Sequence, residues 1–475
     1  SFSLEVVTIP AVRRTAPVAS YANHSVLSTG RWFKLATPVA GIYRITYQDL
    51  VNLGLDPANI DPKNIRLYGN GGGMLPEANA TPRIDDLMEN AILVAGEADG
   101  KFDPQDYILF FGHAPDKWEY NETDKLYRFR KNIYSDRAHY FLTADAGPGK
   151  RVTPAIPPSG QPQTIAEVFE DYAAYEKEEV NLIKSGRQWW DKQYFDLTTV
   201  RNFVFDFENL VLTKPVFLYT HLAARSIGGR TSFSISLQGT TIKNVEIEPI
   251  SGSYDSDFAK ETYASVAFIP PSSNLDIRFQ YNKSSSSSVG YLDFIHLNAT
   301  RILRMAGQQM MFRTMNGVKQ GGITEFRLSG ASSNLIIWEV SSGNQIREIP
   351  YTLSGEMAGF TIETESLKEF CAFTGQSFLV PDLLGVVENQ DLHGMPVPDY
   401  LIIAPPAFLS EAQRLADFHK TNSGLSVTII APELIYNEFS SGSQDVTAIR
   451  DFVRMLYKKA EPGKEPRYLL LFGDA

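Results

Sequence analysis

The clearest pattern of apolar and polar positions lies near the end of the sequence, from Asp399 to Ala475. Three apolar runs there are too short for helices and rich in branched residues, and two longer segments repeat apolar residues at helical spacing. The pattern predicts strands at 399–404, 425–430 and 468–472, and helices at 411–422 and 445–460. Strands that alternate with helices favour a parallel sheet with right-handed crossovers.

The two predicted helices carry recognisable end signals. Ser410 and Asp445 stand where a side-chain oxygen can accept a hydrogen bond from the first free backbone N–H groups. Gly424 follows the first helix and suits the left-handed conformation that ends many helices. The apolar faces are expected to consist of Ala412, Leu415, Ala416 and His419 in the first helix, and of Ile449, Val453 and Leu456 in the second.

The residues before this segment predict strands and turns, with one short helix at 49–55. Strand-like stretches after residue 200 recur at the spacing typical of a β-sandwich, and alternation places Phe233, Ile235 and Leu237 on one face. The predicted fold class is therefore multidomain β plus α/β. N-terminal β-rich domains, including a β-sandwich, precede the first βαβαβ part of a parallel-sheet domain.

The chain divides into six predicted segments. They are an extended N-terminal segment (1–28, with an edge strand at 3–9), a β-rich domain (29–150), a Pro/Gly linker (151–163), the β-sandwich (164–300), a connecting β-rich domain (301–385) and the α/β part (386–475). A three-stranded α/β domain that ends directly after a strand is expected to be incomplete, so we expect the chain to be a fragment.

Composition excludes some classes of function. The formal net charge of −11 gives no general case for a nucleic-acid partner. No apolar run approaches the ~20 residues that span a bilayer, so no transmembrane segment is expected. The sequence has neither a signal peptide nor an initiating Met, and we expect the native N-terminus to have been processed or truncated. Cys371 is the single cysteine, and its apolar, strand-like context favours a buried, inert thiol.

Open α/β sheets bind ligands beyond the carboxyl ends of their strands. Asp474 follows the third strand, and three roles are open to it: it positions a loop, orients a catalytic base or, the favoured role, caps the next helix. His393 precedes the first strand, at the wrong end of the sheet for catalysis, and is interpreted as a loop histidine. The histidines are scattered without metal-ligand spacing, at His24, His113, His139, His221, His296, His393 and His419. No catalytic, cofactor-binding or metal-ligating residue is assigned, and no cofactor is expected.

Two polar motifs have both a structural and a functional interpretation. The glycine run at 69–73 predicts a tight turn, because no helix N-terminus follows it to hold a phosphate. Asp99, Asp103 and Asp106 surround a glycine and are able to bind calcium. Their spacing differs from that of an EF-hand loop, so a hairpin turn is favoured.

The α/β segment resembles the gingipain family of cysteine peptidases. The resemblance rests on DLHGMPVPDYLIIAPPAF, EAQRLADFHKTNSGLSV, ELIYNEFSSGSQDVTAIRDFVRMLY and RYLLLFGDA, taken together. Upstream, GIYRITYQDL, NIRLYGNGGGMLPE, GEADGKFDPQDYILFFG and YSDRAHYFLTA make the chain similar to the sortases of the bacterial type IX secretion system. The resemblance covers nearly the entire chain from about Thr29.

This resemblance implies a gingipain- and caspase-like peptidase domain on a protein attached to the bacterial outer membrane at the cell surface. The implied activity removes the C-terminal signal of secreted cargo through a cysteine thioester and transfers the cargo to anionic lipopolysaccharide. The implied partners are the outer-membrane protein PorV, cargo signal domains and anionic lipopolysaccharide. In the family, the catalytic His and Cys lie downstream of the GDA strand. Cys371 and His393 precede the peptidase strands, so neither matches, and the fragment alone is expected to be inactive.

Two other functions stay open at this stage. A secreted β-sandwich adhesin or glycan-binding protein with a non-catalytic peptidase-like domain would use Trp189, Trp190 and Tyr194 as a sugar-stacking platform, although packing under a long loop explains these aromatic residues equally well. A nucleotide-dependent α/β enzyme ranks last, because Pro405 and Pro406 stand where a glycine-rich loop is required.

Overall fold

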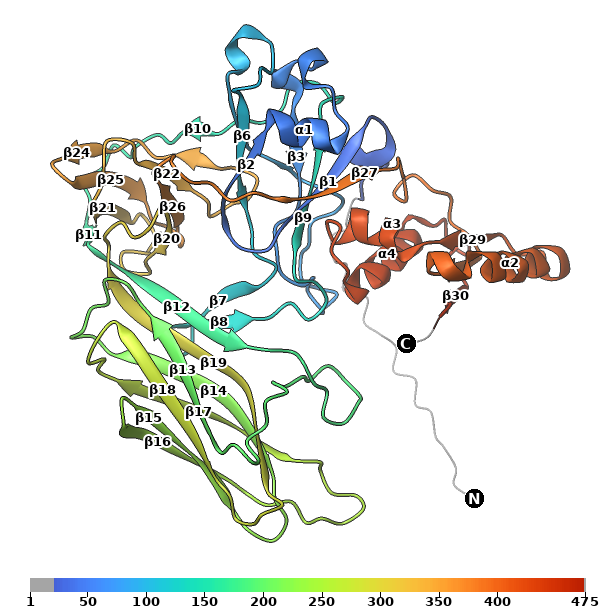
Figure 1. Ribbon diagram of the computed structural model, residues 1–475. Helices are drawn as coiled ribbons and strands as arrows, with labels where there is room; N and C mark the ends of the chain where they lie inside the picture. Colours follow the sequence, from blue (N-terminus) through green and yellow to red (C-terminus); the bar gives the residue numbers. More distant parts are fainter. Residues whose placement is uncertain (1–20, 474–475) are drawn as a thin grey trace.

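The computed structural model describes residues 21–473, and strands dominate this part of the chain (Figure 1). The edge strand expected at 3–9 lies outside the described residues, as does Asp474. Between residues 21 and 473, no helix has the length and apolar character needed to cross a membrane.

Two antiparallel sheets of the N-terminal region share one apolar core, to which Phe33, Leu35, Tyr43 and Ile45 belong. The first has the strand order β27 (Asp382–Val387), β1 (Trp32–Thr37), β9 (Ala138–Thr143), β3 (Arg66–Tyr68) and β4 (Glu89–Asn90); the second has the order β2 (Gly41–Thr46), β6 (Tyr107–Gly112) and β5 (Leu93–Ala95). Strand β27 pairs with β1, so the chain returns to the N-terminal sheet just before it enters the α/β segment. The predicted domain bounds themselves stay predictions.

The short predicted helix is present as α1 (Tyr47–Leu53), two residues earlier than expected. Thr46 and Asp49 form a capping box, in which each side chain accepts a hydrogen bond from the other residue's backbone N–H. Gly54 ends the helix with a φ of 97°, a conformation that costs glycine little. These local signals explain why so short a helix forms where the sequence predicts it.

The predicted β-sandwich consists of two four-stranded antiparallel sheets with one shared core. One sheet has the order β12 (Val168–Glu176), β19 (Val289–Ile302), β14 (Val216–Arg225) and β17 (Lys260–Phe268); the other has the order β13 (Val200–Asp206), β18 (Asn274–Asn282), β15 (Thr231–Leu237) and β16 (Thr240–Ile247). Phe233, Ile235 and Leu237 are buried on one face of β15, which confirms the predicted alternation. Burial of each side chain is worth about 1.5–3 kcal/mol, so the pattern determines which face points inward.

A hairpin joins the N-terminal sheets to the sandwich. It consists of β7 (Lys117–Asn121) and β8 (Leu126–Arg130), and it lies beside β12 in Figure 1. Trp118 stacks on Tyr172 of β12 with ring centroids 4.0 Å apart. The backbone N–H of Tyr127 donates to the Asn298 side chain at 2.7 Å. Stacking and a buried hydrogen bond therefore connect the two regions.

Two further sheets share a core rich in phenylalanine, in which Phe326 and Phe360 stack at 5.1 Å. One has the order β10 (Thr153–Pro154), β23 (Arg347–Glu348), β22 (Ile336–Glu339), β26 (Glu369–Phe373) and β20 (Gln309–Arg313); the other has the order β11 (Thr164–Ala166), β21 (Ile323–Ser329), β25 (Met357–Glu363) and β24 (Thr352–Ser354). Cys371 packs instead in a second core that includes Ile42 and Leu109, so it joins these sheets to the N-terminal region.

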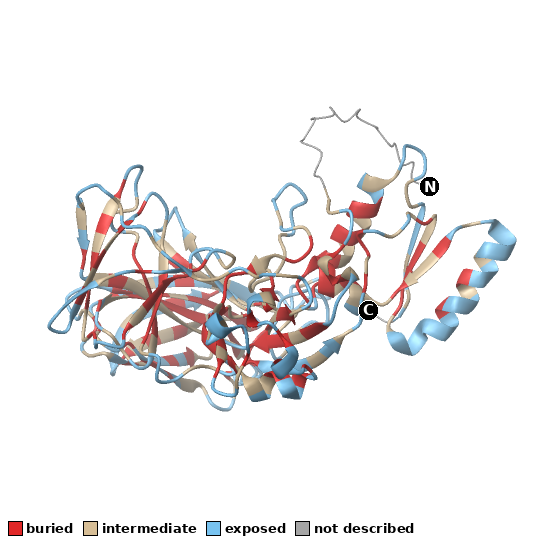
Figure 2. Ribbon diagram, turned by 90° about the horizontal axis from the view of Figure 1, so that it is seen from above, coloured by how far each residue is buried: buried red, intermediate tan, exposed pale blue. Residues whose placement is uncertain are grey.

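The α/β segment forms the predicted three-stranded parallel sheet, in the order β29 (Val427–Ile430), β28 (Tyr400–Ile403) and β30 (Tyr468–Leu471). Helix α2 (Leu409–Ser423) covers one face through Ala412 and Ala416. Helices α3 (Pro432–Phe439) and α4 (Val446–Lys459) cover the other face. Figure 1 places α3 and α4 on the side toward β1 and β27, with α2 farthest away, and Figure 2 shows most of α2 exposed.

The observed ends of the helices differ in part from the predicted ones. Gly424 and Asp445 cap their helices as expected, the latter by accepting a hydrogen bond from the N–H of Thr447. The Ser410 cap is wrong, because a 3-10 turn at Pro406–Phe408 runs directly into α2 and the helix begins at Leu409. Helix α3 was not predicted at all, although Pro432 stands at its first position, where proline is well tolerated.

The predicted face of α4 is only partly right. Leu456 is buried, but Ile449 and Val453 are half-buried, and the most buried residues of the helix are Ala448 and Phe452 together with Met455. The buried face is rotated because α4 packs against α3 and against the segment before β4 as well as against the parallel sheet. Neither the contact with α3 nor the contact with that segment was visible in the sequence pattern.

Candidate functional site

The carboxyl ends of β28, β29 and β30 form the edge where a ligand is expected. Pro405 and Phe408 follow β28, and Phe472 follows β30, with the rings of Phe408 and Phe472 6.1 Å apart. Glu433 lies in the first turn of α3, directly after β29. The described part of this edge therefore offers an apolar floor and one carboxylate.

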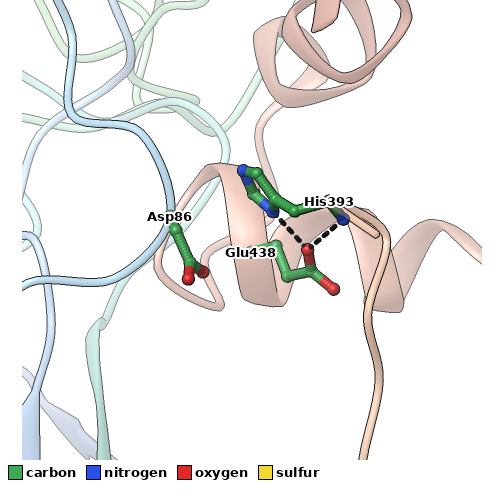
Figure 3. A group of neighbouring side chains, drawn as sticks. All are labelled: Asp86, His393 and Glu438. Atoms are coloured by element: carbon green, nitrogen blue, oxygen red, sulfur yellow. Dashed lines mark hydrogen bonds and ion pairs between the residues drawn. The ribbon is translucent and has the colours of Figure 1, made fainter. Parts of the chain in front are cut away.

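On its other side, the α/β segment is joined to the N-terminal region by a buried ionic cluster around His393 (Figure 3). His393 Nδ1 lies 2.5 Å from Glu438 Oε2, and its Nε2 lies 3.0 Å from Asp85 Oδ1. The side chains of His393 and Glu438 are completely buried. The imidazole also stacks on Phe439 with ring centroids 4.7 Å apart. His393 thus connects α3 with the segment that precedes β4.

Glu438 is the acceptor at the centre of this cluster. Its carboxylate accepts hydrogen bonds from the backbone N–H groups of Leu392 and His393 and from the side-chain amide of Gln390. Hydrogen bonds and an opposite charge are what make a buried carboxylate tolerable. The Glu438 carboxylate therefore has its hydrogen bonds satisfied inside the protein, and its lone pairs are not exposed to a substrate.

His393 and Asp86, which lie close together in this cluster, both have shifted pKa values. Burial alone would lower the pKa of His393, but hydrogen bonds to Asp85 and Glu438 outweigh it and raise this pKa to about 9. Burial raises the pKa of Asp86 to about 6, although the N–H of Val26 and the hydroxyl of Ser25 both donate to its carboxylate. His393 is therefore an imidazolium at neutral pH.

A second layer of contacts holds α4 against the segment before β4. Arg83 forms a nearly buried ion pair with Asp451 at 2.6 Å. The backbone N–H of Leu75 donates to Asp445, and Arg450 donates to the backbone carbonyl of Pro76. The segment 75–86 therefore wraps one side of the α/β segment and fixes its position relative to the N-terminal sheets.

Residues 70–73 of the glycine run line a cavity of about 200 Å³ at this junction, opposite Ser441. No helix follows the run, as predicted. The N–H of Gly73 donates to the carbonyl of Pro115 at 2.7 Å, and the N–H of Asn70 donates to Ser441 Oγ at 3.0 Å. The loop is therefore a close packing element between two parts of the chain.

Substituting Gly72 with alanine tests this packing. An added Cβ would lie 1.6 Å from the carbonyl oxygen of Ala114, so backbone has to move, and we expect a loss of about 3 kcal/mol in urea unfolding. Gly100→Ala is the control: its φ of +80° is strained but nothing lies within 4 Å, so the expected loss is only about 1 kcal/mol. A Gly72→Ala variant as stable as Gly100→Ala would contradict the described packing.

A larger groove of about 570 Å³ lies between α3 and the loop before β9. Glu433 and Tyr436 line it from α3, and Tyr134 and Arg137 line it from the loop. Because Glu433 also follows the carboxyl end of β29, this groove opens beside the edge where the active site of an α/β enzyme is expected.

The sequence candidates are placed as follows. Cys371 is 1% exposed, which confirms the predicted burial, and this burial raises the pKa of its thiol to about 12. His393 lies in a loop as expected, but its burial and ion pairs were not predicted. His139 contacts Ser443 at 3.0 Å, and burial lowers its pKa to about 4. The other histidines are dispersed: His24 and His419 in the N-terminal and α2 regions, His113 after β6, and His221 and His296 in the sandwich.

Asp99, Asp103 and Asp106 act as turn residues. Asp99 accepts a hydrogen bond from the N–H of Lys101, and Asp106 accepts one from the N–H of Asp103. The Asp106 carboxylate also packs so closely on Gly96 that a Cβ there would lie 1.9 Å from it. These contacts fit the favoured interpretation, a turn that leads into β6.

The three aromatic residues of the possible sugar platform do not share one exposed face. Trp190 is 4% exposed and packs between His221 and Tyr291. Trp189 and Tyr194 are each a little over one-third exposed, and Tyr194 packs edge-on against Tyr291. Packing under the loop therefore accounts for Trp190.

Comparisons with known proteins assign the α/β segment. Residues 394–475 match the model of peptidase family C25. A C25 peptidase domain lies at the C-terminal end of the chain. The α/β segment is therefore similar to this family of cysteine peptidases, which supports the gingipain-like resemblance. No curated protein sequence matches the chain.

The likeness extends far beyond the C25 domain. The crystal structure of dimeric latent PorU from Porphyromonas gingivalis matches 95% of this chain at 26% identity, with a TM-score of 0.83. The chain spans 42% of the length of that protein. The β-rich regions and the C25 domain are therefore both similar to PorU, and the predicted fold class is confirmed.

Two other solved structures are far less similar. A carbohydrate-binding module, CBM36 in complex with calcium and xylotriose, shares 14% identity over 26% of this chain and 98% of its own, with a TM-score of 0.18. The Cry8Ea1 endotoxin of Bacillus thuringiensis shares 12% identity over 49% of this chain and 41% of its own, with a TM-score of 0.19. TM-scores this low carry no information on fold or function.

Sequence reasoning missed the His393 cluster for a specific reason. Glu438 lies on the face of α3 that also carries Ile435 and Phe439, and a charged residue among core positions signals a buried partner. Without a predicted helix at 432–439 that signal was invisible. The partners Asp85 and Asp86 lie about 300 residues earlier, and no local pattern connects them with His393.

Proposed function

We propose that this chain is part of a PorU-like sortase, a cysteine peptidase and transpeptidase that processes proteins of the type IX secretion system. The observation that carries the proposal is the likeness to PorU over 95% of the chain, through both the β-rich regions and the C25 domain. A shared peptidase fold alone would support only a cysteine peptidase. Likeness in the β-rich regions favours the sortase over other C25 enzymes.

The proposed reaction has two steps. A cysteine thiolate attacks the carbonyl carbon that precedes the C-terminal signal of the cargo, and the signal leaves with a free amine. An amine of anionic lipopolysaccharide then attacks the thioester and releases the thiolate. Cys371 does not supply this thiolate, because it is buried in β26 and its raised pKa keeps the thiol protonated. The described residues contribute the apolar sheet edge and the neighbouring groove.

The proposal includes location and partners. We place the protein at the cell surface, attached to the outer membrane through PorV, with cargo signal domains and anionic lipopolysaccharide as substrates. The groove between α3 and the loop before β9 suits an extended polypeptide, because it is open, polar and adjacent to the carboxyl end of β29. Glu433 and Arg137 on its two sides provide charges of opposite sign.

Deletion of the gene in its own organism tests this function. We expect secreted proteins of the deletion strain to keep their C-terminal signal domains, as measured by mass spectrometry of their C-terminal peptides. The wild-type gene should restore processing, and so should a Cys371→Ala gene, which is the matched control for the excluded thiol. Normal removal of the signals in the deletion strain would contradict the proposal.

A further inference from the structure

The strand that leads into the C25 domain, β27, has a free edge. It is the outermost strand of its sheet, beside β1 (Figure 1), and β1 is its only partner strand among the described residues. The backbone N–H and C=O groups on its outer side therefore have no strand to pair with. On this strand Leu384 is 52% exposed and Val386 is 66% exposed. An unpaired edge with exposed apolar side chains is an open surface for another strand.

The edge strands of the sandwich carry charges that hinder such pairing. Lys243 and Glu246 are exposed on β16, and Lys260 is exposed on β17. Charged side chains, lysine above all, protect strand edges in natural proteins. In β27 the one charged residue is Asp382, and Arg137 pairs with it at 2.7 Å. The edge of β27 therefore lacks the protection that the sandwich edges have.

A bulge contributes to the exposure of Leu384. The pairing of β1 with β27 shifts between Lys34 and Leu35, so Leu384 has no partner residue on β1. Gly385 follows with a φ of +99°, a conformation that costs glycine little, and nothing lies within 4 Å of the place where its Cβ would be. Bulges are frequent beside functional sites, where they re-aim a side chain.

The free edge begins where the groove between α3 and the loop before β9 ends. His139 lines that groove. In the sheet His139 pairs with Ala36 of β1, and Ala36 pairs with Asp382, the first residue of β27. Directly opposite residues of antiparallel strands lie on the same face, so this row of three residues leads from the groove to the edge. Arg137, which also lines the groove, pairs with Asp382 itself.

We propose that a cargo polypeptide bound in the groove continues along β27 as an added strand of this sheet. The edge selects the class of ligand, because only an extended polypeptide has backbone N–H and C=O groups at the spacing that a strand edge pairs with. Its alternate side chains would lie against Leu384 and Val386, which favours apolar, β-branched residues. This strand addition rests on the proposed function, which supplies the ligand: secreted cargo that still carries its C-terminal signal.

Strand addition at β27 would hold the cargo beside the edge where the reaction is expected. Glu433 lines the same groove and follows the carboxyl end of β29. A polypeptide paired with β27 is therefore fixed on one side of that edge, and its freedom to move before the reaction is reduced. Main-chain hydrogen bonds provide affinity for any extended sequence, whereas the two apolar side chains of β27 select among sequences.

Calorimetry and hydrogen exchange of the 475-residue chain test this surface. The probe is a secreted protein of the same organism, purified with its C-terminal signal intact from the deletion strain described above. Its binding should slow the exchange of the β27 amides, because the added strand pairs with their open side. The double variant Leu384→Lys, Val386→Lys should bind the probe at least about tenfold more weakly, since it removes two apolar contacts and adds charges to the edge.

Val204→Lys is the matched control, since Val204 is 62% exposed on β13, an edge strand of the sandwich. It should leave binding unchanged. All the substituted side chains are exposed, so the melting temperatures should stay close to that of the wild-type chain. The exchange measurement on the wild-type chain requires no variant, so it tests the strand addition even if the double variant does not fold.

Three results would overturn the strand addition: a wild-type chain that does not bind the probe, binding that the double variant leaves unaffected, or β27 amides whose exchange does not change on binding. Slow exchange at β27 without cargo, together with a doubled mass in light scattering, would assign the edge to a second copy of the chain instead. Each of these results leaves the proposed function standing if the deletion strain keeps its signals. Normal removal of the signals in that strain would contradict the function itself.

Discussion

Replacing Glu438 with alanine is expected to lower the free energy of unfolding by about 4 kcal/mol, because removal of one partner from a buried ion pair leaves the other charge uncompensated. The imidazolium of His393 would keep only Asp85, at 3.0 Å, as a direct partner. The amide of Gln390 and the N–H groups of Leu392 and His393 would also lose their acceptor inside the protein. Between residues 21 and 473, no other single side chain at the junction accepts hydrogen bonds from so many buried donors.

The loss of stability in Glu438→Ala should also be visible locally, at α3 and α4. Hydrogen exchange of the α3 and α4 amides should become faster in Glu438→Ala, since the cluster holds α3 against the N-terminal region. Glu433→Ala is the control: this residue lies on the same helix but is exposed, so its substitution should change the stability by no more than about 0.5 kcal/mol. Equal stability of the two variants would show that the buried pair does not hold the junction.

The second large effect is a dependence of stability on pH. The pKa of His393 is raised from 6.5 to about 9 in the folded protein. A group with a raised pKa contributes stability that is fully present below the pKa of the unfolded state and is lost as the pH rises through that of the folded state. The contribution of His393 should therefore be complete below pH 6.5 and decline by about 3 kcal/mol as the pH reaches about 9.

Other groups titrate in or near this pH range, so the prediction concerns the difference in the free energy of unfolding between the wild-type chain and His393→Gln. Asp86 and Glu438 face His393, as does Asp85, and Lys459 donates to its backbone carbonyl. The pKa of Asp86 is raised from 3.8 to about 6, so the contribution of this group to stability is lost as the pH rises from about 3.8 to about 6. That range lies below the one in which His393 titrates. Urea unfolding at a series of pH values should show the loss in the wild-type chain and not in His393→Gln. Parallel pH profiles for the two would refute the assignment of this pKa to the ion pair.

Local patterns predicted much of the fold. The alternation at 231–237 identified Phe233, Ile235 and Leu237 as core residues of a sandwich, since a period of two determines which side chains point inward. In the C25 domain the three parallel strands were predictable because apolar runs alternated with helical periods. Asp445 and Gly424 were recognisable because helix caps depend on a few neighbouring residues.

Features that depend on distant residues were not predictable in the same way. Strand β27 pairs with β1 although about 350 residues separate them, and no local period encodes that pairing. The same holds for the cluster that joins His393 to Asp85 and for Arg83 with Asp451. Junctions and sites built from distant segments require the tertiary structure.

The measurement that tests the proposed sortase most directly is the reaction itself. The native gene product would be incubated with a secreted protein that still carries its C-terminal signal and with an amine acceptor, and the new carboxyl end would be identified by mass spectrometry. We expect a cargo protein that has lost its signal and carries the acceptor in amide linkage, with no change in Cys371→Ala. Cargo that keeps its signal throughout, or a reaction abolished by Cys371→Ala, would contradict it.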